Sequence, residues 1–385
     1  MNIYLDNSAT TKVDKEVIEC MDRFNEEYYA NPAALHRFGY QVEEKVKLAT
    51  EKAASIIGAR QTEIIWTSGG TESNNMALRG VAEAYKKVGN EIITTKIEHP
   101  SIKNTCKYLE ECGFNITYLN VDSSGQILLD ELKEKITDKT ILVSIMFVNN
   151  EIGAVQNIEE IGKIIKEKNK NTLFHTDFVQ GLGKIKINCP KLNIDLLSAS
   201  SHKFHGPKGV GILYKNSNVR IKPLLYGGGQ QNDLRSGTLN TTGIIGTVKA
   251  LELIYDNFDN EIKNMSALRD SLINKLNELN DKYNNIHINT EKNYKFAPHI
   301  VSVAFKGIRS EVMLHSLEEK GIYISAGSAC SSHSKKQSET LKGIGLASDL
   351  IDSTIRISLC KYNKVEDIEA LIREIDLLIP RLKLS

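Results

Sequence analysis

The sequence is short of the residues and patterns that mark several broad classes of protein. Seven prolines in 385 residues leave little room for a long proline-rich linker. No stretch approaches the ~18 consecutive apolar residues of a membrane-spanning helix. The six cysteines lack the Cys-x-x-Cys spacing of a zinc ribbon, and they are too sparse for a disulfide scaffold. These absences argue against a membrane protein and against a small cross-linked domain.

An excess of charge of one sign is missing as well. The chain has 49 Lys and Arg residues against 48 Asp and Glu, a formal net charge of +1. A protein held mainly by phosphate contacts has a basic excess or stripe instead. Residues 1–6 have neither a basic head nor an apolar secretory core. We therefore expect a cytoplasmic protein without direct contact to nucleic acid or membrane.

A regular alternation of patterns is present from about residue 60. Short β-branched runs predict strands over Glu63–Thr67, Glu91–Ile97, Asn115–Val121, Thr140–Val148, Thr172–His175, Asp195–Ala199 and Val210–Tyr214. Longer amphipathic stretches between them predict helices, among them Ser73–Lys87, Ser101–Cys112 and Ile158–Lys168. Strands that alternate with helices favour an α/β protein with a mostly parallel sheet and helices on both faces.

The pattern changes after about residue 260. A long helical stretch, Met265–Leu279, is followed by shorter strand and helix candidates and by a C-terminal helix from Val365. We expect a large domain over residues 15–260 and a smaller C-terminal α/β domain over residues 261–385. Residues 1–14 are expected to form an N-terminal segment that packs with the smaller domain. The length fits two to three units of roughly 150 residues each.

A pair of glycines stands where an expected strand ends and a helix begins. Residues 67–75 read TSGGTESNN. Glycines permit a tight turn and expose N–H groups, the helix N-terminus attracts anions, and Thr71 and Ser73 add hydroxyls, so the segment can hold a phosphate. No Gly-Lys-Ser/Thr follows, which excludes a Walker loop. Taken alone, the segment is equally well a capped strand-to-helix turn.

An acidic and a basic residue follow two later strands. Asp177 comes after an apolar run, and Lys203 follows 26 positions later in a stretch rich in Ser, His and Gly. An acidic residue beside a buried strand is costly without a positive partner. Pyridoxal phosphate needs a lysine for its aldehyde, a carboxylate for its ring nitrogen and an anion site for its phosphate. The chain supplies all three, which predicts pyridoxal phosphate as the cofactor.

These residues belong to a longer series of motifs along nearly the whole chain. In order they are YLDNSATT at 4–11, NP at 31–32 with His36, SGGTESNN at 68–75, EHP at 98–100, VNNEIG at 148–153, HTDFVQ at 175–180, SSHKFHGPKGVG at 200–211, GGGQ at 227–230, RSGT at 235–238 and GSAC at 327–330. The series resembles the cysteine desulfurases of the nitrogen-fixation and iron–sulfur-cluster type. These are class-V aminotransferase relatives with the fold type I of pyridoxal-phosphate enzymes.

The resemblance implies a role for each residue around the cofactor ring. Lys203 resembles the lysine that forms the aldimine, and Asp177 the partner of the pyridinium nitrogen. His99 resembles the histidine that stacks on the ring and transfers protons. Asn150 and Gln180 resemble the side chains beside the phenolic oxygen and the substrate. Lys203 and His99 are thus expected to be catalytic residues, and all five residues to line one site.

The resemblance also implies a phosphate site and a carboxylate site. The residues that resemble phosphate ligands are Gly70, Thr71, Ser200 and His202. Thr238 resembles a phosphate contact that is donated by the second subunit of a homodimer. Arg356 resembles the arginine that pairs with the substrate carboxylate, for which a fork of parallel N–H donors is well suited.

Cys330 distinguishes the expected reaction from transamination. It lies in a Ser-, Gly- and Lys-rich stretch where His333, Lys335 and Lys336 favour the thiolate, the form that attacks sulfur. The resemblance makes it the catalytic cysteine that takes up sulfur as a persulfide. No metal ligands are expected, apart from a transient contact between Cys330 and an iron–sulfur cluster. The other cysteines are expected to be mostly core residues, with Cys20, Cys106 and Cys360 the best candidates.

Two positions depart from the family pattern, and two histidines lie outside it. Phe178 stands where a small residue is usual, which affects the packing beneath the cofactor. Gln337 stands where a proline is frequent. His299 and His315 fall in apolar patterns and are expected to be core or boundary residues rather than ligands.

The expected function is a homodimeric pyridoxal-phosphate-dependent cysteine desulfurase that converts L-cysteine to L-alanine. Its sulfur would pass to acceptor or scaffold proteins for iron–sulfur clusters, thio-cofactors or tRNA thiolation. Two alternatives stay open: a β-lyase specialised for selenocysteine or cysteine sulfinate, and a docking or regulatory protein that keeps the fold with little turnover.

Overall fold

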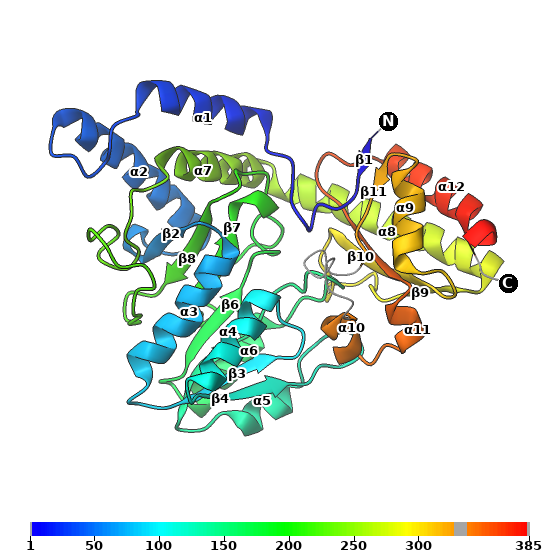
Figure 1. Cartoon of the computed structure of the whole chain (residues 1–385), viewed down its shortest axis with the longest axis horizontal. Coiled ribbons are helices and arrows are strands. Elements are labelled where there is room, and N and C mark those ends of the chain that lie inside the picture. The colour runs from blue at the N-terminus through cyan, green and yellow to red at the C-terminus, as the bar shows by residue number, and fades with distance from the viewer. Residues whose placement is uncertain (1, 327–336, 383–385) are drawn as a thin grey trace.

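A seven-stranded sheet forms the centre of the larger part of the molecule (Figure 1). The computed structural model describes residues 2–326 and 337–382. The strand order is β2-β8-β7-β6-β5-β3-β4, with bounds β2 (Ile64–Thr67), β3 (Glu91–Thr95), β4 (Asn115–Leu119), β5 (Thr140–Ser144), β6 (Leu173–Asp177), β7 (Leu196–Ser200) and β8 (Gly211–Lys215). Strands β3 to β7 pair in parallel, and β8 runs antiparallel to β7 and β2. This confirms the predicted mostly parallel sheet.

Helices cover both faces of this sheet because successive strand side chains point to opposite sides. Ile65 and Leu142 pack in the cluster on one face, whereas Trp66 and Val143 belong to the cluster on the other. The first face carries α3 (Gly70–Tyr85) and α4 (Pro100–Glu111). The second carries α2 (Arg37–Ile56), α5 (Leu129–Lys135), α6 (Ile158–Lys168) and α7 (Thr241–Asp256), with α1 (Lys15–Glu27) packed on α7. The result is a three-layer α/β arrangement.

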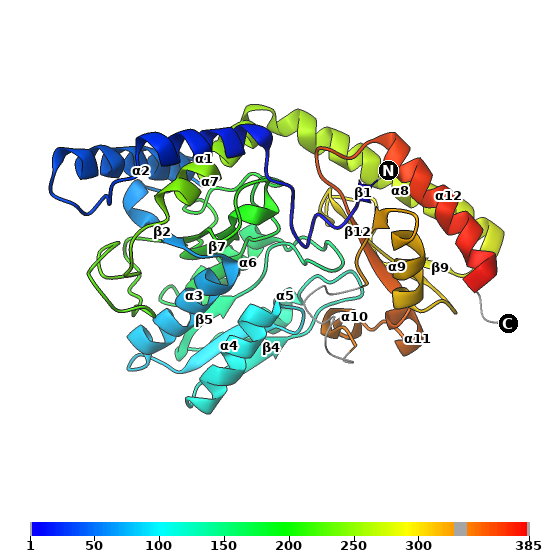
Figure 2. The ribbon, with the colours of Figure 1, turned by 45° about the horizontal axis from the view of Figure 1, so that its top comes forward.

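The C-terminal part has its own sheet and helices beside the large sheet (Figure 2). It also has a hydrophobic cluster of its own. Its sheet has the order β12-β10-β9, with β9 (Ile286–Ile288), β10 (Ile300–Phe305) and β12 (Thr354–Ser358) paired antiparallel. The helices of this part are α8 (Phe258–Tyr283), α9 (Ser310–Glu318), α10 (Glu339–Gly343), α11 (Ser348–Ile351) and α12 (Val365–Leu382). Met265 on α8 already packs in the C-terminal cluster, whereas Phe258 packs in the large one. The division into domains near residue 260 stays a prediction.

The N-terminal segment runs past both hydrophobic clusters. Strand β1 (Ile3–Tyr4) pairs in parallel with β11 (Ile322–Tyr323) of the C-terminal part. Residues 6–14, which we call the strap, then lead to α1, and the blue trace in Figures 1 and 2 shows this passage. Within the strap, the Thr11 N–H donates to the His202 carbonyl at 2.9 Å. The strap therefore contacts the segment that carries Lys203.

Several expectations about individual elements and residues need correction. The two N-terminal helices, α1 and α2, were not anticipated, and α3 begins at Gly70 rather than at Ser73. Among the described cysteines, Cys20 is only partly buried and Cys112 is exposed. His315 is exposed and pairs with Glu318 at 3.1 Å, because it lies on the solvent face of α9. None of the described helices is both long and apolar enough to span a bilayer.

Candidate active site

A cavity of about 290 Å³ opens at the carboxyl ends of the parallel strands, where ligands bind in open α/β sheets. The residues around it include ten that the sequence predicted: Gly70, Thr71, His99, Asn150, Asp177, Gln180, Ser200, His202, Lys203 and Arg356. Thr238 is exposed and does not line the cavity. Cys330 lies outside the described residues. The structure thus brings together all the predicted residues except these two.

Lys203 enters the cavity from a short turn after a buried strand. The 3-10 turn Ser201–Lys203 directly follows β7. The Nζ atom donates to the main-chain carbonyls of Ser8 at 2.6 Å and Ala9 at 2.8 Å. Both acceptors belong to the strap, whereas the donor follows a strand of the large sheet. The strap therefore orients the amine.

Asp177 ends strand β6 and is 5% exposed. Its Oδ2 accepts from Asn74 Nδ2 at 2.8 Å, and its Oδ1 accepts from the Val179 N–H at 2.9 Å. The Asn74 amide also donates to Ser101 Oγ at 2.9 Å. Sequence reasoning missed Asn74, although it lies one helical turn after Gly70 on α3 and so shares its face. These donors hold a buried carboxylate in place beside the cavity.

His99 caps the N-terminus of α4. Its Nδ1 accepts from the Ser101 N–H at 3.1 Å and contacts Ser101 Oγ at 2.7 Å. Burial is the main cause of a lowered pKa of His99; Asp177 opposes this effect and Lys203 adds to it. An imidazole that is neutral at physiological pH can accept a proton.

Glu98, next to His99, is a buried carboxyl that sequence reasoning did not single out. Its Oε1 accepts from the Met146 N–H at 2.9 Å and from Thr95 Oγ1 at 2.8 Å. Burial raises its pKa to about 8 despite these hydrogen bonds. The group is therefore mostly protonated at neutral pH, and its contacts fix the turn that carries His99.

At the end of the cavity where the sequence predicts the phosphate, a helix N-terminus lies beside a neutral histidine. A Cβ at Gly70 would lie 2.6 Å from Val179 Cγ2, so only glycine fits at this first residue of α3. His202 Nδ1 contacts Thr10 Oγ1 at 3.1 Å. Burial, together with the charge of Lys203, lowers the pKa of His202 to about 4. N–H donors at a helix N-terminus suit an anion.

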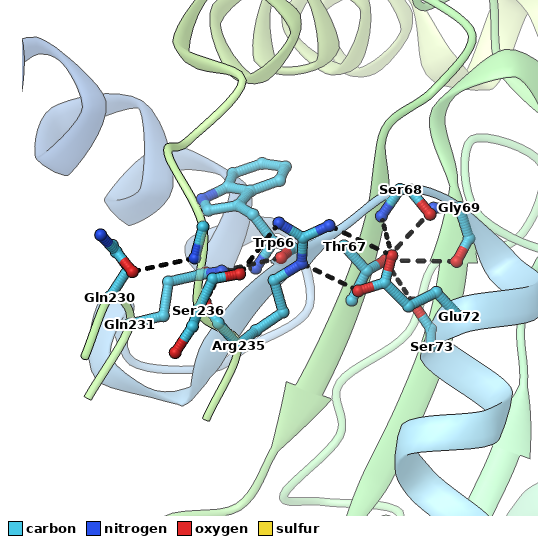
Figure 3. A network of polar contacts seen from close by, with 11 residues as sticks. Trp66, Thr67, Ser68, Gly69, Glu72, Ser73, Gln230, Gln231, Arg235 and Ser236 are labelled. Atoms are coloured by element: carbon cyan, nitrogen blue, oxygen red, sulfur yellow. Dashed lines mark hydrogen bonds and ion pairs between the residues drawn. The ribbon is translucent and has the colours of Figure 1, made fainter. Parts of the chain in front are cut away.

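A polar network fastens the loop between β8 and α7 to this helix N-terminus (Figure 3). Glu72 accepts from the Ser68 N–H at 2.8 Å and from Arg235 Nε at 2.9 Å. Burial raises the pKa of Glu72, but the hydrogen bonds from Arg235 and Ser68 outweigh it and lower the pKa overall. The Gln231 amide pairs with both main-chain groups of Trp66, at 2.7 and 2.9 Å. The loop that contains Thr238 is thus fixed to β2 and to the N-terminus of α3.

Arg356 on β12 closes the cavity from the C-terminal part. The guanidinium donates from Nη1 to the Asn150 carbonyl at 2.8 Å and from Nη2 to Asp6 Oδ1 at 2.8 Å. It is 2% exposed, and its buried Nε finds no partner among the described residues. A buried N–H without a partner is costly. The two Nη atoms are thus anchored to Asn150 and Asp6, and the guanidinium lines the cavity.

The residues on either side of the Cys330 segment are attached near the same cavity. Ser325 forms a main-chain bridge with Arg356, with N···O distances of 3.1 and 2.7 Å. Ser338 donates to Glu151, the neighbour of Asn150. Both described ends of the segment thus lie beside residues that contact the cavity.

The two departures from the family pattern have local partners. The Phe178 ring is fully buried in the large core and stacks on Phe147, with centroids 5.0 Å apart. It does not line the cavity. Gln337 Nε2 donates to Ser348 Oγ at 2.7 Å and to Asp352 Oδ1 at 3.0 Å. Neither side chain lines the cavity.

Comparisons with known proteins agree with this geometry. The family model described as Aminotransferase class-V matches residues 3–371. The chain is 44% identical over 381 residues to a "Cysteine desulfurase IscS" from Methanosarcina thermophila, covering 99% of this chain and 93% of that protein. A solved "NIFS-LIKE PROTEIN" superposes with a TM-score of 0.93 at 40% identity, covering 99% of this chain and 100% of its own.

A third relative is a solved structure described as "SspA in complex with cysteine". Its TM-score is 0.80 at 35% identity, and the match covers 94% of this chain and 100% of that one. Enzymes of this family depend on pyridoxal phosphate. With matches over nearly the full length, the chain belongs to the class-V aminotransferase family and, within it, to the cysteine desulfurases.

Proposed function

We propose that this protein converts L-cysteine to L-alanine and takes up the sulfur on Cys330 as a persulfide. One observation carries the proposal: Lys203, Asp177, His99 and Arg356 line a single cavity. An amine, a buried carboxylate, a neutral imidazole and a guanidinium are the groups that this reaction needs. The complex of SspA with cysteine supports the choice of substrate.

The residues around the cavity fit pyridoxal phosphate. Asp177 keeps its carboxylate fixed through Asn74 and the Val179 N–H, and we assign it to the ring nitrogen. Lys203 would hold the aldehyde carbon, and His99 would lie against the ring. For the phosphate we assign Gly70, Thr71, Ser200 and His202, and for the phenolic oxygen Asn150 and Gln180.

The cofactor, when bound, supplies an electron sink for the negative charge that develops at the substrate α-carbon. Arg356, which lines the cavity, binds the substrate carboxylate through its guanidinium. Because burial keeps the His99 pKa low, its imidazole can take up the α-proton and return it. Asp177 would keep the ring nitrogen protonated when the cofactor is bound.

The sulfur moves to the protein in one displacement. The Cys330 thiolate attacks the substrate sulfur, a new S–S bond forms, and the C–S bond breaks with its electron pair going to carbon. Carbon then takes up a proton, and the product leaves as alanine. The persulfide on Cys330 is finally reduced or passed to an acceptor.

The assembly and the acceptors also belong to the proposal. We place Thr238 at the phosphate of a second subunit, which requires a homodimer. The acceptors would be proteins that build iron–sulfur clusters or thiolate tRNA, with cytoplasmic location as the sequence predicts. No observation on the described residues favours the β-lyase or the docking alternative.

The test is to quantify alanine, the product common to all three substrates, from the purified enzyme with L-cysteine, selenocysteine or cysteine sulfinate, and to quantify sulfide from L-cysteine under a reductant. The proposal predicts equal amounts of alanine and sulfide from L-cysteine, with cysteine used at least as fast as the other two substrates. A preference for selenocysteine or cysteine sulfinate would support the specialised β-lyase. No turnover of any of the three would support the docking protein.

A further inference from the structure

A second lysine lies directly behind the cavity. Lys184 is 6% exposed, and its Nζ donates to the main-chain carbonyl of Lys203. It does not line the cavity. Turn hydrogen bonds from Gly181 to Phe178, at 2.9 Å, and from Lys184 to Gly181, at 2.9 Å, connect it to the end of β6. Lys184 thus joins the segment after Asp177 to the turn that carries Lys203.

The surroundings of Lys184 disfavour the positive charge of its amine. Burial lowers its pKa to about 8. The titratable groups that act on it are Cys360 and Glu261, which favour its charge, and Lys203 and Lys361, which oppose it. Its own charge in turn lowers the pKa of His202, His205 and His299. Asp14 completes the surroundings, bound to Lys361 at 2.7 Å and 3.8 Å from His205.

A buried ammonium group needs a reason, because an apolar side chain of similar volume avoids the desolvation cost. Lys215 offers a comparison within the same chain. Lys215 is 9% exposed, and its Nζ donates to the carbonyls of Asn216 at 3.1 Å and Val219 at 2.9 Å. Lys215 ties down a loop at the far end of β8. Lys184 differs because the carbonyl that it holds belongs to the residue that meets the cofactor.

We propose that Lys184 is a positioning residue for Lys203: its hydrogen bond fixes the turn that presents the Lys203 amine, and its positive charge disfavours a second positive charge on that amine. The inference rests on the proposed role of Lys203 at the cofactor. Lys184 acts through Lys203 and contacts neither substrate nor cofactor. Reciprocity supports the electrostatic part, since the charge of Lys203 lowers the pKa of Lys184 and each charge must therefore disfavour the other.

The experiment is a pH titration of the cofactor's visible absorbance band in the holoenzyme. It compares wild type with Lys184→Met, Lys184→Gln and Lys184→Arg, and it uses Lys215→Met as the matched control. Met removes the charge and the donor, Gln keeps a donor without charge, and Arg keeps both. Far-ultraviolet circular dichroism and the thermal midpoint establish that each variant is folded.

Removing the charge is expected to raise the midpoint of the absorbance change by roughly 0.5 to 1 pH unit, because the charges of Lys184 and Lys203 oppose each other in a partly buried site. Met and Gln should both show this rise, whereas Arg and Lys215→Met should titrate near wild type. A fall of about tenfold in kcat with little change in KM would accompany the rise in Met, because the carboxylate site is untouched.

Unchanged midpoints in folded Met and Gln variants would overturn the proposal, and so would an equal rise in Lys215→Met. If Lys184→Met does not fold, the difference in absorbance midpoint between Lys184→Gln and Lys184→Arg tests the proposal in the same way. Failure of the proposed function is recognised separately. In that case the wild-type protein would show no visible band that disappears in Lys203→Ala. This comparison is made before any Lys184 variant is measured.

Discussion

The two walls of the cavity are built in different ways. One wall, which we call the sheet wall, consists of residues at the carboxyl ends of the large sheet, such as His99, Asp177 and Lys203. The other, the strap wall, consists of strap residues and Arg356 from the small sheet. Its central ion pair joins Asp6 and Arg356, which are 350 positions apart. One wall is arranged by strand order, the other by the meeting of the two chain ends.

This difference teaches where each wall is vulnerable. In the sheet wall, Asp177 is held by donors from α3 and from its own strand end, so it stays in place as long as the sheet is folded. In the strap wall, the partners are carbonyls and one carboxylate on a segment without regular secondary structure. Lys203 connects the two, because it follows a sheet strand while its amine donates to Ser8 and Ala9.

The largest effect is expected from breaking the sheet wall at Lys203. Lys203→Ala removes the amine and should abolish covalent attachment of the cofactor, with turnover reduced more than about 10³-fold. Borohydride reduction followed by peptide mass analysis measures the attachment. Lys208→Ala is the control, because Lys208 is exposed nearby and should leave the attachment intact. A cofactor still fixed to the Lys203→Ala protein would contradict the assignment.

A smaller loss is expected from the other end of the same wall. Asp177→Asn keeps the shape of the side chain but removes the charge at the ring nitrogen, so turnover should fall by roughly 10²- to 10³-fold while the cofactor stays bound. The readouts are kcat and the visible spectrum. Asp195→Asn is the control: Asp195 pairs with Lys166 at 2.6 Å at the opposite end of the sheet. A near-normal kcat for Asp177→Asn would remove Asp177 from the reaction.

The strap wall is expected to govern substrate affinity. Arg356→Gln removes the charged donors for the substrate carboxylate, worth about 1.5 to 3 kcal/mol, so KM for L-cysteine should rise roughly 10- to 100-fold. Cysteamine, which lacks the carboxylate, should bind with unchanged affinity in a spectral titration. The exposed Arg309 provides a control as Arg309→Gln. Equal losses for both ligands would show that Arg356 acts on the fold rather than on the carboxylate.

The smallest effect concerns stability rather than activity. His175 on β6 is fully buried between Ser144 and Ser198, and burial lowers its pKa from 6.5 to about 3. Below pH 6.5 the unfolded chain therefore binds a proton that the folded chain does not. The free energy of unfolding accordingly decreases as the pH is lowered through that range. From pH 7 to 5 the loss from this group is about 2 kcal/mol.

Urea unfolding at both pH values tests this expectation. His175→Gln should lose about 2 kcal/mol less than wild type between pH 7 and 5. The exposed His315 provides the control, since His315→Gln should keep the wild-type slope. Parallel slopes for all three proteins would show that His175 is not held neutral in the folded state.

Much of the sheet wall could be predicted from the sequence, and little of the strap wall. Asp177, Lys203 and the glycine pair each follow a recognisable strand, and parallel strands bring such positions to one edge. The same local signals do not reveal that Asp6 meets Arg356 or that Ser8 presents its carbonyl to Lys203. Periodicity carries no information on pairs so far apart in the chain, or on which main-chain groups are used.

The sequence analysis did not identify Asn74 and Lys184 as residues near the site, and it assigned the wrong environment to His315. Asn74 could have been found, because it lies four residues after Gly70 on the same helix face. Lys184 could not, since a lysine near a strand end is ordinarily exposed. The expectation that His315 is a core or boundary residue was wrong, because Met313 and Leu317 occupy the buried side of α9 and His315 lies on the exposed side.

The most direct test of the central claim is the mass of the cysteine-containing peptides after incubation with L-cysteine without reductant. The account predicts an added sulfur, about 32 Da, on the peptide that contains Cys330. It predicts none on the peptide with the exposed Cys112. In Cys330→Ser, alanine release should collapse while the spectral response to cysteine persists, because the sheet wall is intact. Added sulfur on a different cysteine, or undiminished alanine release from the serine variant, would contradict the account.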